Sequence, residues 1–357
     1  MKNKIYFTPG PSQLYFTVEE HIKNALKKDI LSISHRSKIF KILYQECVEN
    51  IKILFNLNSN YHIAFTSSAN EIWERIIQNL IIKSSIHYVN GSFSKKFFDY
   101  TKKYKINSKI IESYYEPYNY NIKYSDEELI AITLNETSTG ISCPNDKIKE
   151  ARLKFKNSLI ALDCVSGSPA IPFEIKNVDT FYFSVQKCFG LPSGLGVWVY
   201  NNQCIDKCFK KIEKKEIVGS YHSLVKLNEL GKKNQTPETP NVLGIYLLKN
   251  VINDMLKKGI KNIINETNYK SKIIDFTIKN HDQISHLIKN ENIRSKTVKV
   301  AKTNKISNNL IKKLIKQNLI IGKGYGKNNY QIRIANFPTH SKENIEMLCD
   351  IISKTNF

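Results

Sequence analysis

The chain has 357 residues, of which 41% are hydrophobic and 11% aromatic. This composition is typical of a globular protein rather than a disordered one, and the length allows one large and one small domain. No apolar run reaches the roughly 20 residues that cross a bilayer, and the first residues lack the apolar stretch of an export signal. Seven scattered cysteines without CxxC spacing favour reduced thiols over disulfides or a zinc site. We therefore expect a cytoplasmic protein without a bound metal.

The formal net charge is +22, which makes nucleic-acid binding one class to consider. The excess lysines are spread along the whole chain and accompany abundant Asn, Ile and Tyr, as a codon bias toward A and T would produce. The sequence contains no helix-turn-helix, zinc-finger or aromatic-basic RNA motif. The charge therefore predicts attraction of anionic substrates to a cleft. A non-catalytic basic binding protein stays as a distant alternative.

Helical and strand patterns alternate between about residues 18 and 250. Apolar residues at three- and four-residue spacing predict a helix over 39–54, and a strand is predicted over 61–66. A turn over 67–70 and a helix over 71–82 follow. Further strands are predicted over residues 86–89, 129–134, 159–162, 180–184 and 195–200. This alternation predicts a mostly parallel sheet covered on both faces, with ligands at the carboxyl ends of its strands.

The last third of the chain has a different pattern. A Pro- and Gly-containing stretch over 231–240 precedes a helix predicted over 242–257. The remainder predicts a smaller α+β unit, with helices over 269–279, 306–317 and 342–355 and strands over 297–301 and 331–335. We therefore expect a large domain over residues 14–250 and a small domain made of residues 251–357 together with residues 1–13.

Two ionisable residues follow predicted buried strands. Lys187 lies between the strand at 180–184 and a glycine-bearing loop, which places its amine in a dry pocket. Burial lowers the pKa of an amine and makes it nucleophilic toward an aldehyde. Asp163 ends the strand about one βα unit upstream. A lysine that forms an imine and an aspartate that pairs a pyridinium nitrogen are the protein groups that pyridoxal phosphate (PLP) needs most.

Other loops carry polar residues whose role the residues alone leave open. Residues 67–70 suit either a phosphate cradle at a helix N-terminus or an ordinary N-cap. Residues 135–140 suit either a bond to a phenolic oxygen or a polar turn. Phe93 could stack on a ring or belong to the core. The glycine-rich residues 322–327 lack the P-loop arrangement and are interpreted as a lysine-bearing wall of a substrate pocket.

Arg36 and Arg333 are candidate contacts for substrate anions. Arg333 lies in a predicted apolar strand, where an arginine is costly to bury unless it meets an anion. The guanidinium fork matches a carboxylate at two points. Together the two arginines could hold a dicarboxylate or an amino acid, whereas either alone would more often be a structural ion-pair partner.

Taken in chain order, the candidate residues Arg36, Ser68, Phe93, Thr137, Asp163, Lys187 and Arg333 resemble the pattern of the class V aminotransferases of PLP fold type I. Within that class they are most similar to the phosphoserine aminotransferases. The resemblance covers nearly the full chain, and its most specific segments are Ile33-Ser-His-Arg-Ser-Lys-Ile-Phe40, Asn135-Glu-Thr137 and Gln186-Lys187. It implies an α/β fold, with a mostly parallel seven-stranded sheet in the large domain and a small α+β carboxyl-terminal domain. It also implies a homodimer that transfers an amino group between L-glutamate and 3-phosphohydroxypyruvate, giving O-phospho-L-serine and 2-oxoglutarate in serine biosynthesis.

The resemblance further implies a role for each candidate residue. Lys187 would form the imine with PLP, and Asp163 would hold the pyridine nitrogen protonated. Thr137 would bond the ring hydroxyl oxygen, and Phe93 would stack on the ring. The cofactor phosphate would be bound by Ser68, Ala69 and Gln186 of one subunit and by Gln235 and Thr236 of the other, and substrate anions by Arg36 and Arg333.

The chain departs from the family over residues 322–327, where many phosphoserine enzymes carry a His-Arg pair that grips the substrate phosphate. Lysines at this place are point charges without a bidentate fork. Another class V aminotransferase, such as a serine or alanine:glyoxylate enzyme, is therefore the nearest alternative. A cysteine desulfurase is a further rival, but the only late cysteine, Cys349, lies in a predicted amphipathic helix where a packing role is expected.

Overall fold

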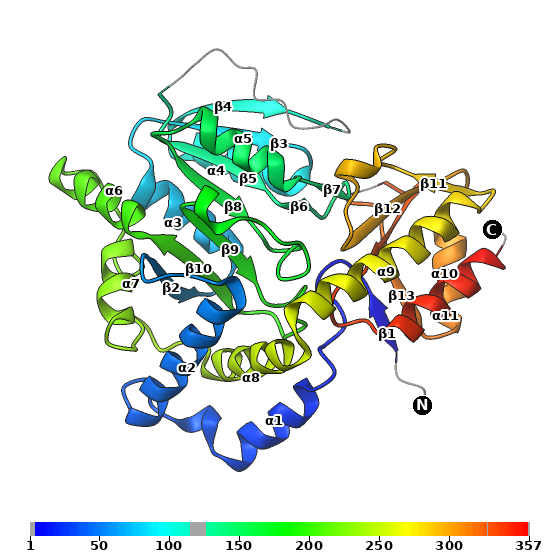
Figure 1. Cartoon of the computed structure of the whole chain (residues 1–357), viewed down its shortest axis with the longest axis horizontal. Helices are drawn as coiled ribbons and strands as arrows, with labels where there is room; N and C mark the ends of the chain where they lie inside the picture. Colours follow the sequence, from blue (N-terminus) through cyan, green and yellow to red (C-terminus); the bar gives the residue numbers. More distant parts are fainter. Residues whose placement is uncertain (1–3, 115–125, 327, 356–357) are drawn as a thin grey trace.

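The structure is a computed structural model that describes residues 4–114, 126–326 and 328–355. These residues form a seven-stranded sheet, a five-stranded sheet and a two-stranded ribbon, β6 (Asn135–Glu136) with β7 (Ile141–Ser142). Helices cover both faces of the seven-stranded sheet, and the five-stranded sheet lies at the opposite end of the molecule with helices packed against it (Figure 1).

The larger sheet has the strand order β2-β10-β9-β8-β5-β3-β4. Its strands are β2 (Tyr61–Thr66), β3 (Ser84–Val89), β4 (Asn107–Glu112), β5 (Leu129–Thr133), β8 (Leu159–Asp163), β9 (Thr180–Ser184) and β10 (Gly196–Asn201). Strand β10 runs antiparallel to β2 and β9, and the other pairings in the sheet are parallel. The mostly parallel seven-stranded sheet expected from the sequence is therefore confirmed.

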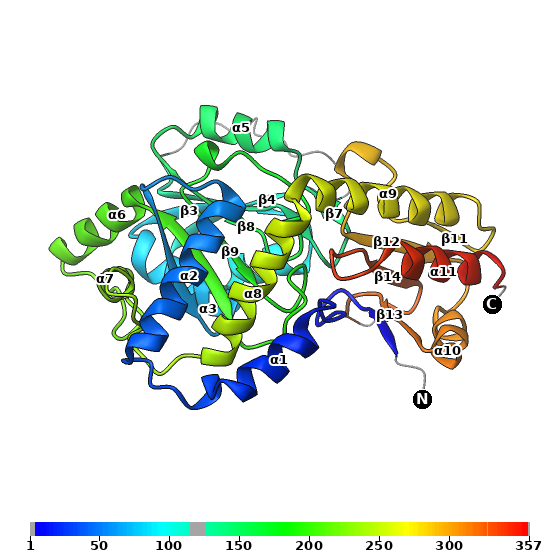
Figure 2. The same cartoon turned by 60° about the horizontal axis from the view of Figure 1, so that its bottom comes forward.

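Each central strand is buried on both faces because its side chains alternate between two hydrophobic cores. In β9, Phe181 and Phe183 face one core, whereas Tyr182 faces the other. Helices α2 (Lys38–Phe55), α5 (Asn145–Lys154) and α8 (Val242–Lys258) supply the first core. Helices α3 (Ala69–Leu80), α4 (Ser92–Lys103), α6 (Asn202–Glu213) and α7 (Leu224–Gly231) supply the second. Figure 2 shows α2 and α8 side by side over one face, with α1 (Val18–Lys27) beside them.

The smaller sheet combines a strand from the start of the chain with four strands from its last third. Its order is β1 (Ile5–Phe7), β13 (Leu319–Lys323), β14 (Gln331–Ala335), β12 (Val298–Thr303) and β11 (Ile284–His286). Helices α9 (Ile260–Lys279), α10 (Asn308–Lys316) and α11 (Lys342–Ser353) pack on it, and Phe7 belongs to their common core. Both chain ends accordingly lie near this sheet (Figure 1). The domain division at residues 250 and 251 stays a prediction.

Two helices begin earlier than the sequence predicted. Helix α3 begins at Ala69 because the Ser68 hydroxyl caps it by accepting the Glu71 N–H. Helix α9 begins at Ile260 rather than near residue 269, directly after Gly259, whose φ is +86°. The buried face of α9 carries polar as well as apolar residues (Ile263, Thr267, Lys270, Ser271 and Ile274). This mixture hides the apolar spacing that reveals a helix.

No helix in the described part of the chain is long and apolar enough to cross a membrane. Residues 4–114, 126–326 and 328–355 also contain no group of three or more His, Cys, Asp or Glu side chains that could hold a metal ion. All seven cysteines are buried. Cys349 lies in α11 within the core of the smaller sheet, as a packing role requires.

Candidate active site

A cavity of about 240 Å³ lies at the carboxyl ends of β5, β8 and β9. Asp163 ends β8, and Lys187 follows the end of β9. Thr137 comes from the ribbon after β5, and Phe93 from the first turn of α4. Arg333 reaches the cavity from β14 of the smaller sheet. The cavity is therefore built between the two sheets, where ligands of open parallel sheets bind.

Lys187 is only 7% exposed, and its amine has two neighbours from other elements. Its Nζ donates a hydrogen bond to Thr137 Oγ1 at 2.8 Å and lies 4.9 Å from the centre of the Phe93 ring. Burial lowers the pKa of the Lys187 amine, although the charges of Asp163 and Glu136 oppose this shift. The structure thus gathers three sequence candidates around one buried amine whose proton is easier to lose.

The amino-terminal segment covers the Lys187 side chain. A Cβ on Gly10 would lie 2.8 Å from Lys187 Cε, and the φ of Gly10 is +142°. Both the space and the backbone therefore require glycine here. The sequence analysis assigned Gly10 no role at the site.

Asp163 is a buried carboxylate at the base of the cavity. Burial raises its pKa to about 6, while the Val165 N–H, which donates to Oδ1 at 3.0 Å, and the charge of Lys187 lower it. Trp73 lies close enough to Asp163 to lower its pKa as well, and the single indole N–H of Trp73 donates to the Tyr182 hydroxyl at 2.8 Å. Trp73 lines the cavity and was missed, since a tryptophan at helical spacing reads as core.

The turn before α3 meets the cavity through Ala69, and Gln186 lines it beside Lys187. The Ala69 N–H donates to Ser184 Oγ at 2.8 Å, which joins the turn to β9. The Ser68 hydroxyl serves as the N-cap of α3. The N-cap interpretation of the turn is therefore confirmed for Ser68. The first residues of α3, Ala69 and Asn70, line the cavity, and a helix N-terminus favours an anion, but that the turn holds a phosphate stays a prediction.

Glu136 is fully buried beside the cavity, and the sequence analysis named it only as part of the Asn135–Thr137 segment. Its carboxylate accepts hydrogen bonds from the Phe93 and Ser94 N–H groups at 3.3 and 3.0 Å and from the Ser138 hydroxyl at 2.6 Å. A Cβ on Gly91 would lie 2.3 Å from Glu136 Cγ. Glu136 thus fixes the first turn of α4 and with it the Phe93 ring.

Arg333 is held at the cavity by backbone and aromatic contacts. Its Nε donates to the Lys323 carbonyl at 2.7 Å, and its guanidinium lies 5.5 Å from the centre of the Tyr325 ring. Tyr325 in turn meets Phe93 edge-on at 5.2 Å. Lys323 is exposed and does not line the cavity, so the wall at residues 322–327 presents Tyr325 instead of this lysine. Lys327 lies outside the described residues.

Four predicted site residues do not line the Lys187 cavity: Ser68, Arg36, Gln235 and Thr236. Ser68 directly precedes Ala69, which does line it, whereas the other three lie elsewhere. Arg36 Nη1 instead donates to Gln235 Oε1 at 2.7 Å, and the Thr236 hydroxyl donates to the Glu238 carbonyl at 2.8 Å. Arg36 is therefore separated from Arg333 and joined to the segment expected to reach a second subunit. That these residues complete a partner's site stays a prediction.

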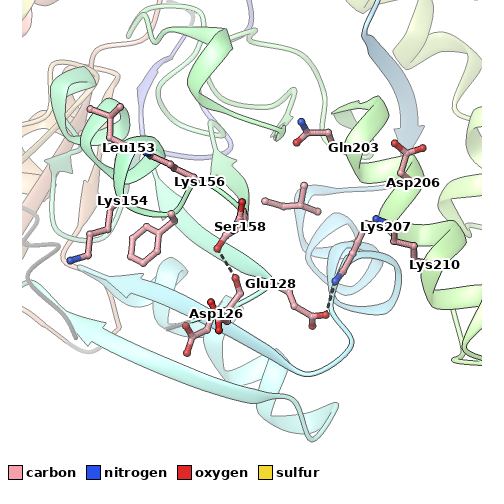
Figure 3. A pocket seen from close by; sticks show the side chains of 14 residues that line it. Asp126, Glu128, Leu153, Lys154, Lys156, Ser158, Gln203, Asp206, Lys207 and Lys210 are labelled. Atoms are coloured by element: carbon pink, nitrogen blue, oxygen red, sulfur yellow. Dashed lines mark hydrogen bonds and ion pairs between the residues drawn. The ribbon is translucent and has the colours of Figure 1, made fainter. Parts of the chain in front are cut away.

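A second, larger hollow of about 510 Å³ lies at the opposite, amino ends of β5 and β8 (Figure 3). Its charged lining residues are Asp126, Glu127, Glu128, Lys154, Lys156, Asp206, Lys207 and Lys210. Charges of both signs meet there, for example Lys207 Nζ and Glu128 Oε1 at 2.5 Å. The hollow lies at the wrong ends of the strands for a site of this fold, so the smaller Lys187 cavity is the candidate.

Comparisons with known proteins agree with the fold. The family model described as Aminotransferase class-V matches residues 109–337. A phosphoserine aminotransferase structure from Cytophaga hutchinsonii ATCC 33406 superposes with a TM-score of 0.97 at 42% identity, covering 100% of both chains. The phosphoserine aminotransferase of Rhodococcus opacus (strain B4) is 28% identical over 252 residues, 70% of this chain and 65% of that protein. A PLP-bound phosphoserine aminotransferase from Trichomonas vaginalis has the same fold, with a TM-score of 0.82 at 18% identity over 99% of this chain and 100% of that one.

Proposed function

Since this chain belongs to the class V aminotransferases and is a PLP-dependent enzyme, we propose that it makes O-phospho-L-serine. It would transfer the amino group of L-glutamate to 3-phosphohydroxypyruvate, with 2-oxoglutarate as the second product. The full-length likeness at 42% identity to a phosphoserine aminotransferase is the observation that carries this proposal. We further propose that it works as a cytoplasmic homodimer in serine biosynthesis.

The residues of the cavity fit the cofactor. Lys187 offers a buried amine, and Phe93 offers an aromatic face beside it. Asp163, whose burial makes its negative charge costly, suits a positively charged ring nitrogen. The N-terminus of α3 suits a phosphate. When bound here, PLP supplies an electron sink for the bond that breaks at the substrate Cα.

The chain's own groups would then move and hold protons. The lowered pKa of Lys187 leaves more of its amine unprotonated, and an unprotonated amine is the nucleophile. With its amine free, Lys187 Nζ would act as the general base that takes the substrate Cα proton. Thr137 Oγ1, 2.8 Å from that nitrogen, holds it in position. The Asp163 carboxylate would keep the ring nitrogen of bound PLP protonated.

Substrate anions would be bound by two arginines from different subunits. Arg333 lines the cavity, and its Nε donates a hydrogen bond to the Lys323 carbonyl, which fixes the plane of the guanidinium. Its terminal nitrogens suit the α-carboxylate, as a bidentate pair. The partner subunit's Arg36 would meet the far end of the substrate, with Gln235 and Thr236 reaching the cofactor phosphate.

A substrate comparison tests the proposed reaction. The purified enzyme with L-glutamate is assayed against 3-phosphohydroxypyruvate, hydroxypyruvate and glyoxylate. We expect kcat/KM to be at least about a hundredfold higher for the phosphorylated acid, since loss of a charge-assisted anion contact costs a few kcal/mol. Equal rates, or a preference for glyoxylate, would favour the serine or alanine:glyoxylate alternative.

A further inference from the structure

A buried histidine outside the cavity lies between two carboxylates. His222 precedes α7 and is 2% exposed. Its Nδ1 contacts the Glu71 carboxylate, and its Nε2 lies 2.7 Å from Glu238 Oε2. A neutral imidazole has a single N–H, so only the imidazolium can donate to both carboxylates at once. With both carboxylates ionised, the geometry therefore favours a charged His222 in a Glu71–His222–Glu238 bridge.

One end of this bridge holds the turn at the N-terminus of α3. The second carboxylate oxygen of Glu71 accepts the Ser67 N–H at 2.8 Å and the Ser67 hydroxyl at 2.7 Å. Ser67 directly precedes Ser68 and Ala69, which are assigned to the cofactor phosphate. Glu71 thus ties the backbone of the phosphate turn to His222.

The other end holds the segment assigned to the partner's site. The Glu238 side chain bonds to His222, and its carbonyl accepts the Thr236 hydroxyl at 2.8 Å. Thr236 is itself only 2% exposed. The neighbouring Gln235 is held by Arg36. Glu238 therefore fixes the position of residues 235 and 236 relative to the turn over residues 67–70 of the same chain.

We propose that His222 is a positioning residue for the cofactor phosphate at both sites of the dimer. This inference rests on the proposed homodimer, in which Gln235 and Thr236 reach the partner's phosphate. Each phosphate is then held by the turn of one subunit and by the segment of the other. The bridge inside each subunit connects that subunit's own phosphate turn to the segment that serves the opposite site.

The surroundings of the bridge keep the histidine charged. Burial alone lowers the pKa of His222, but hydrogen bonds to Glu238 and Glu71 outweigh it and raise the pKa from its usual 6.5 to about 9. The pKa of Glu71 falls to about 2, because bonds from His222 and Ser67 outweigh its burial. The other titratable or charged groups around the bridge are Tyr221, whose ring stacks on His222 at 3.9 Å, Arg75, His35 and Arg36.

The test measures phosphate recognition separately from imine formation. Dissociation constants of PLP and of pyridoxal, which lacks the phosphate, are determined on the cofactor-free full-length protein. Both ligands form the same imine at Lys187, so the ratio of the two constants isolates the phosphate. The variants are His222→Gln and Glu238→Gln, which keep size and polarity. The control is His62→Gln, on the strand that leads into the same turn and bonded to Asn202 at 2.7 Å.

We expect the preference for PLP over pyridoxal to fall at least about tenfold in His222→Gln and in Glu238→Gln, the scale of a lost charged hydrogen bond. The control should keep the wild-type preference. In the wild type, the raised pKa of His222 means that the bridge is fully formed below pH 6.5 and is lost as the pH rises through about 9. The preference should fall over that range, and less so in His222→Gln.

Failure of the bridge and failure of the dimer site give different results. If Thr236→Ala lowers the preference for PLP but His222→Gln and Glu238→Gln do not, the bridge is refuted. If His222→Gln lowers it and Thr236→Ala does not, the segment does not reach a phosphate, and the two-site role is refuted together with the proposed dimer site. A drop in all three variants, with the control unchanged, supports the inference.

Discussion

The cavity around Lys187 and the surface around Arg36 divide the candidate site residues between two places in one chain. The cavity unites an amine, a carboxylate and an aromatic ring that are all buried or partly buried. The Arg36 surface carries an exposed guanidinium bonded to Gln235. Within one chain, Lys187, Asp163 and Arg333 therefore share a cavity that Arg36, Gln235 and Thr236 do not line. Under the proposed function, the Arg36 surface of one subunit would complete the cavity of its partner.

The largest effect is expected at the centre of the cavity. Lys187→Ala removes the nucleophile and general base, so kcat should fall by at least about 10³-fold. The visible absorbance of the cofactor imine should disappear with it. As a control, Lys270→Met alters another buried lysine, which bonds to two backbone carbonyls outside the cavity, and should keep the absorbance. Turnover by Lys187→Ala would contradict the assignment of this residue.

The burial of Asp163 should be measurable without substrate. Folding raises the pKa of Asp163 from 3.8 to about 6, so the folded protein favours the protonated carboxyl. As the pH rises through 6 the buried carboxyl ionises, and its ionisation lowers the free energy of unfolding. Cofactor-free Asp163→Asn should therefore be more stable than the wild type at pH 8, by up to about 3 kcal/mol. The difference should vanish near pH 4. Urea unfolding at both pH values checks this, and a variant less stable at pH 8 would contradict it.

The smallest effect is expected at the rim, where Tyr325 meets Arg333 and Phe93. Tyr325→Ala removes ring contacts worth about 0.5–1.5 kcal/mol, so KM should rise severalfold with kcat little changed. Tyr325→Phe keeps the ring and should behave like the wild type if packing is the role of this side chain. A large loss in Tyr325→Phe would instead assign the role to the hydroxyl. Steady-state kinetics with both substrates distinguishes the two.

The sequence predicted the parallel sheet because its strands are continuous apolar runs, and it predicted Lys187 and Asp163 because both follow such runs. It missed residues whose role depends on distant partners. Glu71 and His222 are separated by 151 positions, and nothing in either neighbourhood indicates the other. Gly10 matters only because the amino-terminal segment folds back over Lys187. The sequence analysis overlooked Tyr325 because Lys323 and Lys327, on either side of it, carry the positive charge that suits a phosphate.

The division between cavity and surface is the central claim, and mixed dimers test it most directly. Lys187→Ala and Arg36→Ala homodimers, each impaired alone, are unfolded together, refolded and assayed. If Arg36 serves the partner's cavity, each mixed dimer regains one intact site, and activity returns above that of either parent. If Arg36 served its own cavity, every site in the mixture would carry a defect. Activity that never rises above the parents would contradict the account.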